Sequence, residues 1–369
     1  FVLVAPRPAW RALPVLKNLM TRIMPSMTAH RRKVGHEKLI EIDDRETGLR
    51  GYIAIHSTKS GPALGGTRIW RYKSLAECKE DALRLSRSMS YKCAVVGLPF
   101  GGGKAALIAP RNLKRFKTHK YWQAYTRFVN ELDGEFFTGE DVGLTHDDAR
   151  VMRLYSRFII GAGNGHSPSP FAAEGVFYAI RGALKFSRGT PNLRGRHVVI
   201  KGVGNLGSKL AELLLNAGAR VTISDIDHRK VAKLQRKYPK VGIIVPDKAH
   251  EIDADVFAPC ALGNEIRPAT VPAIKASIVC GGANNQVADN ASVIALAKRG
   301  IIYVPDFVAN AGGLIVVADE LDKRGFSLNR VHERIRNIER KVFIILSRAR
   351  RQHSYPTAVA QEMALSKLN

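Results

Sequence analysis

The sequence has few cysteines, and no pattern joins them. Only Cys78, Cys93, Cys260 and Cys280 occur among the 369 residues, and no two form a C-x-x-C pair. This spacing argues against a disulfide framework and against a cysteine zinc site, and it suits a reducing compartment. The eleven histidines show no metal-site spacing either, so we expect no bound metal.

Long apolar runs and repeats are also missing. No run of eighteen or more apolar residues occurs, so we expect no transmembrane segment. Internal repeats and low-complexity tracts are absent as well. The hydrophobic content of 45 % is that of a folded globular protein, and the length suits two domains.

Acidic residues are scarce relative to basic ones. The chain has 58 Lys and Arg against 32 Asp and Glu, a net charge of +26. Such an excess favours a polyanionic partner, although a generally basic proteome would produce it too. No motif with paired RNA-stacking aromatics is visible, so any RNA contact would be to the backbone.

The basic residues concentrate at both ends. Residues 1–38 carry eight Lys and Arg against one acid, with the composition of a mitochondrial targeting segment. Residues 323–369 carry eleven against three, mostly within a helix expected over 327–351. We therefore expect a mitochondrial matrix protein, with cytoplasmic residence as the alternative. Local clusters such as "RRK" (31–33), "RNLKRFKTHK" (111–120) and "SRARRQ" (347–352) could bind phosphates or simply form solvated surfaces.

The stretch "HVVIKGVGNLGSKLAELLLNAGARVTISDID" reads as strand, glycine turn, helix and strand. Gly202, Gly204 and Gly207 form G-x-G-x-x-G between the first strand and the helix. This context predicts a dinucleotide-binding turn, with the pyrophosphate at the helix N-terminus beside Asn205. Asp225 ends the second strand, where it would bind the adenosine ribose and favour NAD over NADP, although Arg229 could blur that preference.

Further short apolar runs after this unit, "DVFAPCAL", "ASIVCGG" and "GIIYVPDF", predict additional parallel strands. Before it, "KLIEIDDRETGLRGYIAIHS" predicts a hairpin. "SLAECKEDALRLSRSM" predicts a helix with Ser74 and Glu77 as a capping box. The fold class is therefore α/β with two domains, the second of them a Rossmann domain.

"VGLPFGGGKAAL" places Lys104 directly after three glycines. Ala105 stands where the P-loop requires Ser or Thr, which argues strongly against a phosphate-cradling lysine. A lone lysine is most often a surface charge, but here the flanks are apolar and glycines bring the backbone close. Lys92 lies twelve residues earlier, and Asp141 follows in "GEDVG", which favours a base held in a pocket.

Several blocks together resemble the glutamate/leucine/phenylalanine/valine dehydrogenase family, most closely its leucine and valine branch. These blocks are "GPALGGTRIW", "SYKCAVVGLPFGGGKAAL", "GEDVG", "GVGNLG", "APCALGNEI", "GGANNQ" and "VPDFVANAGGLIVVADE". The resemblance runs from about Leu39 to the C-terminus, and it implies an N-terminal α/β substrate domain and a Rossmann NAD-binding domain, with C-terminal helices packing back on the first. It implies NAD-dependent oxidative deamination of a branched-chain L-amino acid to a 2-oxo acid and ammonium, and a homo-oligomer.

The resemblance also implies roles for individual residues. Lys92 would bind the substrate carboxylate, Lys104 would be the general base that activates water, and Asp141 would handle the proton at nitrogen. The substrate site would be formed by Leu64, Gly65, Gly66, Met89 and Val316. Asn285 would contact the nicotinamide side.

Two positions depart from the family pattern: Gly139 replaces an alanine before "ED", and Ala172 stands where members carry a threonine near the nicotinamide. A lost hydroxyl contact would weaken cofactor binding by about 1 kcal/mol. The alternative function is a dehydrogenase fold recruited as a structural or RNA-contacting subunit of a mitochondrial assembly such as a ribosome. We expect an extension over 1–38, a substrate domain over 39–168, a Rossmann domain over 169–321 and basic C-terminal helices over 322–369.

Overall fold

The computed structural model describes residues 35–110, 117–161, 165–261 and 263–368. These residues form two compact units, each of which is described by itself. The N-terminal unit comprises residues 35–175, 311–341 and 358–368, and the central unit comprises residues 176–310 and 342–357. The expected two-domain α/β class is confirmed. Of the basic N-terminal extension, residues 1–34 lie outside the described residues.

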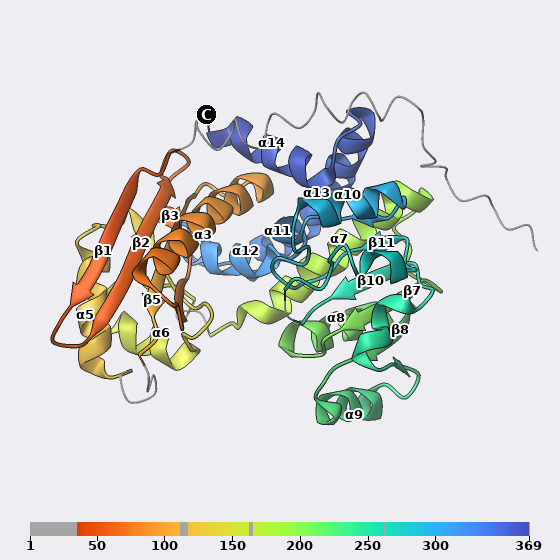
Figure 1. Ribbon diagram of the computed structural model, residues 1–369, viewed down its shortest axis with the longest axis horizontal. Coiled ribbons are helices and arrows are strands. Elements are labelled where there is room, and N and C mark those ends of the chain that lie inside the picture. The colour runs from red at the N-terminus through yellow and green to blue at the C-terminus, as the bar shows by residue number, and fades with distance from the viewer. Residues whose placement is uncertain (1–34, 111–116, 162–164, 262, 369) are drawn as a thin grey trace, which may run out of the picture. The chain divides into compact units, whose positions relative to one another are not determined.

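The N-terminal unit is built on a mixed six-stranded sheet (Figure 1). Strands β1 (Lys38–Asp44) and β2 (Leu49–Ser57) form the predicted antiparallel hairpin, and β2 pairs with β5 (Gly101–Ile108). Along its other edge β5 pairs in parallel with β3 (Ala63–Leu64) and then with β4 (Thr67–Trp70), and β3 pairs with β6 (Phe136–Phe137). The two residues between β3 and β4 are Gly65 and Gly66.

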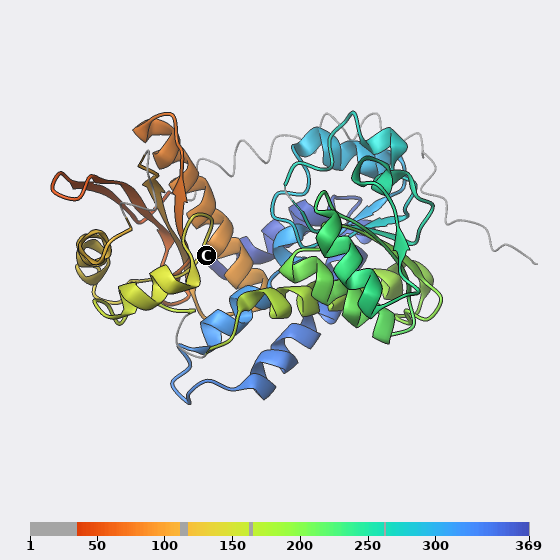
Figure 2. The ribbon, with the colours of Figure 1, turned by 90° about the horizontal axis from the view of Figure 1, so that it is seen from below.

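Helices cover both faces of this sheet (Figure 2). Helix α3 (Leu75–Val96) packs on one face, where Cys78 and Ala82 meet small residues of β2 and β5. Helices α5 (His119–Asn130) and α6 (His146–Arg153) cover the other face, with Trp122 and Tyr125 in the core. Because side chains alternate along a strand, each β5 residue faces one of these two layers.

The start of α3 differs slightly from the predicted capping box. Ser74 is the N-cap, and its side chain accepts a hydrogen bond from the Glu77 backbone N–H at 3.1 Å, as expected. The Glu77 carboxylate accepts a bond from the Lys73 N–H at 2.7 Å, one residue before the cap. The glutamate thus still binds a free N–H at the helix entrance, but a different one.

The central unit is a parallel six-stranded sheet with order β12-β11-β10-β7-β8-β9. Strands β7 (His197–Lys201) and β8 (Arg220–Ser224) flank helix α8 (Asn205–Asn216), as the strand-turn-helix-strand pattern predicts. The other strands are β9 (Gly242–Ile243), β10 (Val256–Pro259), β11 (Ile278–Val279) and β12 (Ile302–Tyr303). The other helices that lie wholly in this unit are α9 (His228–Lys237), α10 (Asn290–Lys298) and α11 (Asp306–Ala309), with 3-10 turns at Pro246–Glu251 and Val271–Ala273.

Three helices carry the chain between the units: α7 (Pro168–Arg188), α13 (Leu328–Arg351) and α14 (Pro356–Leu368). Helix α12 (Gly312–Asp319) belongs to the N-terminal unit. The unit boundaries therefore fall near residues 175 and 310, instead of the expected 168 and 321. A sequence pattern indicates where an element begins but not which elements it packs on. The sequence alone therefore places residues 311–321 with the Rossmann domain that they follow.

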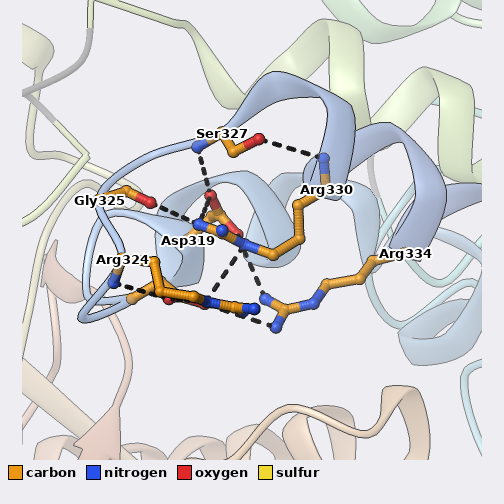
Figure 3. A network of polar contacts seen from close by, with 7 residues as sticks. Asp319, Arg324, Gly325, Ser327, Arg330 and Arg334 are labelled. Carbon is orange, nitrogen blue, oxygen red and sulfur yellow. Dashed lines mark hydrogen bonds and ion pairs between the residues drawn. The ribbon is translucent and has the colours of Figure 1, made fainter.

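A buried ion network joins α12 to α13 (Figure 3). The Asp319 carboxylate is fully buried and accepts bonds from Arg330 Nε at 2.6 Å and Nη2 at 2.8 Å. Arg334 Nη1 lies 3.3 Å from the same carboxylate, and the Ser327 N–H donates to it at 2.8 Å. Asp319 therefore fixes the end of α12 against the first turn of α13.

Candidate functional site

Lys104 lies in the middle of β5, on the sheet face covered by α3. It stands opposite Ala54 in the register with β2, and Ala54 and Ala106 both pack in the α3 layer. The side chain is 7 % exposed. A lysine inside a strand cannot form a phosphate-binding loop before a helix, so the structure agrees that Lys104 is not a P-loop residue.

Asp141 forms an ion pair with Lys104 Nζ, and its side chain is 16 % exposed. Burial lowers the pKa of Lys104, an effect that the Asp141 charge opposes and the nearby Arg68 guanidinium strengthens. Burial also disfavours ionised Asp141, but Lys104 and Arg68 outweigh it and lower the pKa of that carboxyl to about 2. The pair thus combines an acid that is ionised at neutral pH with a lysine that loses its proton more readily than a surface lysine.

Gly65 and Gly66 allow close approach around this pair. A Cβ at position 65 would lie 1.8 Å from the Gly103 carbonyl oxygen and 3.4 Å from the Met89 side chain. A Cβ at position 66 would lie 2.9 Å from Asp141 Cβ. The structure therefore brings these predicted site residues into one region with Leu64, the buried last residue of β3.

Lys92 and Val316 lie on helices. Lys92 follows Met89 by one turn of α3, which places it on the same side of the helix, and it is half-buried. Val316 lies in α12 and is 1 % exposed. Both belong to the N-terminal unit, as do Lys104 and Asp141.

Arg68 is a charged residue of this region to which we assigned no role from the sequence. It lies on β4, its side chain is 18 % exposed, and its Nε is 3.4 Å from Asp141 Oδ2. Its Nη1 is 3.1 Å from Asp81 Oδ2 on α3. The signal was available in "GGTR", because period-two alternation places residue 68 on the same face as Lys104.

The structure explains one of the two departures from the family pattern, Gly139, and does not explain the other, Ala172. A Cβ at Gly139 would lie 2.4 Å from the Ile160 carbonyl oxygen, so this backbone packs too closely for alanine. Ala172 is a half-buried residue of α7. A Cβ at Gly312 of α12 would lie 3.2 Å from the Ala172 backbone nitrogen, so the two helices are in close contact there.

The glycine turn of the central unit has the geometry predicted for a dinucleotide site. Gly202 has φ +100°, and a Cβ there would lie 2.7 Å from Ala261. A Cβ at Gly207 would lie 1.9 Å from the Gly202 carbonyl oxygen, so α8 packs tightly on the turn. At Gly204, the N-cap of α8, a Cβ would meet nothing within 4 Å, and the next residue, Asn205, is exposed. Open space in front of a helix N-terminus suits a phosphate group.

Asp225 follows β8 and is held beside this turn. Its Oδ2 accepts a bond from the Val203 N–H at 2.8 Å, and its Oδ1 accepts one from the Asp227 N–H at 2.9 Å. Arg229, which the sequence left as a competing influence, pairs with Asp227 at 3.4 Å and is otherwise exposed. The Asp225 carboxylate, which we expect to meet the ribose, is therefore fixed in orientation. The Arg229 guanidinium forms its ion pair with Asp227.

Asn285 lies in the loop after β11 with φ +53°, and its side chain is exposed. Its carbonyl oxygen accepts a bond from the Asn264 N–H at 2.7 Å. Its neighbour Gln286 is fully buried and donates to the Gly281 carbonyl at 2.7 Å. The buried glutamine thus anchors a loop that presents the asparagine outward.

The residues present fit a dinucleotide cofactor, because the open helix N-terminus at Gly204 and the fixed Asp225 lie on one turn. Among the described residues, no group of three or more His, Cys, Asp or Glu could hold a metal ion. None of the helices described here is long and apolar enough to span a bilayer. All four cysteines are free thiols.

Comparisons with known proteins agree with this arrangement. Residues 36–157 match the Glu/Leu/Phe/Val dehydrogenase dimerisation domain, and residues 166–229 and 226–368 match the Glutamate/Leucine/Phenylalanine/Valine dehydrogenase model. A phenylalanine dehydrogenase from Lysinibacillus sphaericus is 40 % identical over 85 % of this chain and 84 % of its own length. A leucine dehydrogenase from Thermoactinomyces intermedius is 36 % identical over 91 % of this chain and 92 % of its own length.

The crystal structure of L-tryptophan dehydrogenase from Nostoc punctiforme superposes with a TM-score of 0.82. It is 35 % identical and covers 93 % of this chain and 98 % of its own. The expected resemblance is thereby confirmed in both sequence and structure. The chain belongs to the glutamate/leucine/phenylalanine/valine dehydrogenase family and is an NAD(P)-dependent amino acid dehydrogenase.

Proposed function

We propose that this dehydrogenase converts a branched-chain L-amino acid, NAD⁺ and water to the 2-oxo acid, ammonium, NADH and a proton. The observation that carries the proposal is the buried pair of Lys104 and Asp141, with Lys104 at a lowered pKa. A lysine with a lowered pKa loses its proton at a lower pH than a solvent-exposed lysine and can then act as a base.

In this mechanism Lys92 binds the substrate carboxylate and orients the amino acid. NAD held at the Gly204 turn and by Asp225 would supply the hydride acceptor for the substrate Cα, and the substrate ammonium, which gives up one proton to solvent, would become an iminium. Lys104 then takes the protons of the water that attacks the iminium carbon, and Asp141 relays them to the nitrogen, which leaves as ammonium. The buried setting strengthens each of these charge interactions relative to bulk water.

The preference for an aliphatic substrate follows from the apolar character of Leu64, Met89 and Val316. The relatives act on leucine, phenylalanine and tryptophan by name, so aromatic substrates are the main competitors. A series of L-leucine, L-valine, L-isoleucine, L-phenylalanine and L-tryptophan ranks the candidates by kcat/KM. A ranking led by the aromatic amino acids would overturn the branched-chain assignment while preserving the reaction type.

We further propose NAD as the preferred cofactor. The Asp225 carboxylate is oriented by two backbone N–H groups and would repel a 2′-phosphate. The replacement Asp225→Ser removes this repulsion and a ribose acceptor together. It should reduce kcat/KM for NAD at least tenfold and bring it closer to kcat/KM for NADP.

The test of the function is NADH formation measured by absorbance with the purified protein and each amino acid. Lys104→Ala should abolish turnover, whereas Lys120→Ala, at a side chain 62 % exposed, should leave it intact. A folded protein that turns over none of these amino acids would contradict the proposal.

The net charge of +26 supports a second proposal: that the protein also associates with RNA in the mitochondrial matrix through phosphate contacts. The two activities are compatible. Binding to a mixed-sequence RNA should weaken steeply as the salt concentration increases, and subcellular fractionation tests the location.

We also propose that the free enzyme is a homo-oligomer, in keeping with the dimerisation domain of its family. Light scattering measures the mass of the assembly.

A further inference from the structure

A chain of alternating charges extends through the N-terminal unit from the ion pair of Lys104 and Asp141. Arg68 lies between two carboxylates, with Nε 3.4 Å from Asp141 Oδ2 and Nη1 3.1 Å from Asp81 Oδ2. The side chains of Arg68 and Asp81 are 18 % and 15 % exposed. Two largely buried acids thus share one guanidinium, which donates a hydrogen bond to Asp81 through Nη1 and lies within ion-pair distance of Asp141 through Nε.

Asp81 is in turn held by two neighbours. The Tyr72 hydroxyl donates to Asp81 Oδ2 at 2.7 Å, and Arg84 Nη2 donates to Oδ1 at 2.6 Å. Both carboxylate oxygens therefore have partners, and Asp81 is anchored independently of Arg68. An anchored acid behind Arg68 restricts how far the guanidinium can move toward Asp141.

The charged groups that face Lys104 come from three elements besides its own strand. Asp141 follows β6, Arg68 lies on β4, and Asp81 lies on α3, which also carries Lys92. Asp141 and Asp81 raise the pKa of Lys104, whereas Arg68 adds to the lowering caused by burial. Arg68 therefore lowers the pKa of Lys104 and Asp81 raises it, although these two side chains form an ion pair with each other.

We propose that Arg68, held in place by Asp81, is a positioning residue that orients Asp141 against Lys104 and keeps Lys104 available as a base. The proposal rests on the proposed function of Lys104. Without Arg68, the attraction of Asp141 for the lysine would be less offset and would favour the ammonium form of Lys104. Without Asp81, Arg68 would be free to move onto Asp141 and weaken its pull on the lysine.

The test is the pH dependence of kcat/KM for amino acid oxidation at saturating NAD. In the wild type, kcat/KM should rise with pH as Lys104 loses its proton. Arg68→Met should move this rise to higher pH by on the order of half a unit or more, and Asp81→Asn should move it to lower pH. A purely structural role could lower activity in both variants but would not shift the two profiles in opposite directions.

Two further variants complete the design. Arg68→Lys keeps the charge and loses the fork, so it should retain the pH profile of the wild type and lower its plateau. If Arg68→Met does not fold, Asp81→Asn decides the question by its predicted shift to lower pH, while Arg68→Lys should keep the wild-type profile. Arg50→Met, at an exposed side chain of β2, is the matched control and should leave profile and plateau unchanged.

The outcomes separate this proposal from the proposed function. If Lys104→Ala keeps its turnover, the base assignment itself is wrong. If Lys104→Ala is inactive but the profiles of Arg68→Met and Asp81→Asn coincide with the wild type, Lys104 remains the base and only the positioning role is overturned.

Discussion

Gly66 lies against Asp141 so closely that a Cβ on the glycine would be 2.9 Å from the aspartate Cβ. The same Cβ would be 2.6 Å from the Glu140 carbonyl oxygen, so the backbone itself would have to move. The glycine pair between β3 and β4 thus sets the position of the acid that faces Lys104.

We predict that Gly66→Ala lowers kcat at least tenfold, because displaced Asp141 no longer meets Lys104 in the same geometry. The strain should also reduce the free energy of unfolding by about 1–3 kcal/mol. Steady-state kinetics and urea unfolding measure the two effects. Gly35→Ala, where a Cβ meets nothing within 4 Å, is the control. Wild-type kcat in Gly66→Ala would show that Asp141 does not depend on this contact.

The glycines of the dinucleotide turn should respond differently from one another. Gly204→Ala adds a methyl group to open space, so folding should be unaffected, but the methyl would obstruct the pyrophosphate and raise the Kd for NADH about tenfold. Gly207→Ala would place its methyl 1.9 Å from a carbonyl oxygen and should lower Tm strongly. Fluorescence titration with NADH and thermal unfolding separate the two. Equal cofactor affinity in Gly204→Ala and the wild type would argue against the assigned phosphate position.

Much of this site could be predicted from local sequence. The G-x-G-x-x-G turn follows a strand and precedes a helix, so its three glycines take up roles that depend only on nearby backbone. Lys104 could be assigned to a pocket because glycines and apolar residues surround it. Arg68 and Asp81 could not be linked, since they come from a strand and a helix that meet only through tertiary packing. The assignment of α12 to the N-terminal unit depends on the same long-range packing.

The Asp319 network predicts a large effect on stability (Figure 3). Asp319→Asn leaves Arg330 and Arg334 without their buried partner and should reduce the free energy of unfolding by about 2–3 kcal/mol. The estimate is at the lower end for a buried pair because the arginines retain some exposure to water. Urea unfolding at constant pH provides the measurement. Arg324→Gln, at a side chain 69 % exposed, should change stability little. An unchanged midpoint in Asp319→Asn would show that the network adds nothing to stability.

His56 predicts a pH-dependent stability. It is 1 % exposed, and burial together with His36 and Arg87 lowers its pKa from 6.5 to about 4. Between these values the unfolded chain binds a proton that the folded chain does not, so stability is lost as pH falls through that window. The loss should be on the order of 2–3 kcal/mol, and His56→Gln should remove it. Urea unfolding at pH 7 and pH 4.5 tests this, with exposed His228→Gln as control. The same loss in His56→Gln and wild type would assign it to other groups.

The central claim is that Lys104 is the base of an amino acid dehydrogenase, and chemical rescue tests it most directly. Folded Lys104→Ala is assayed for NADH formation with L-leucine in the presence of small primary amines of increasing basicity. We predict negligible turnover without amine and a rate restored in proportion to amine concentration, since an amine can enter the space left by the side chain. Turnover at the wild-type rate in the absence of any amine would contradict the claim.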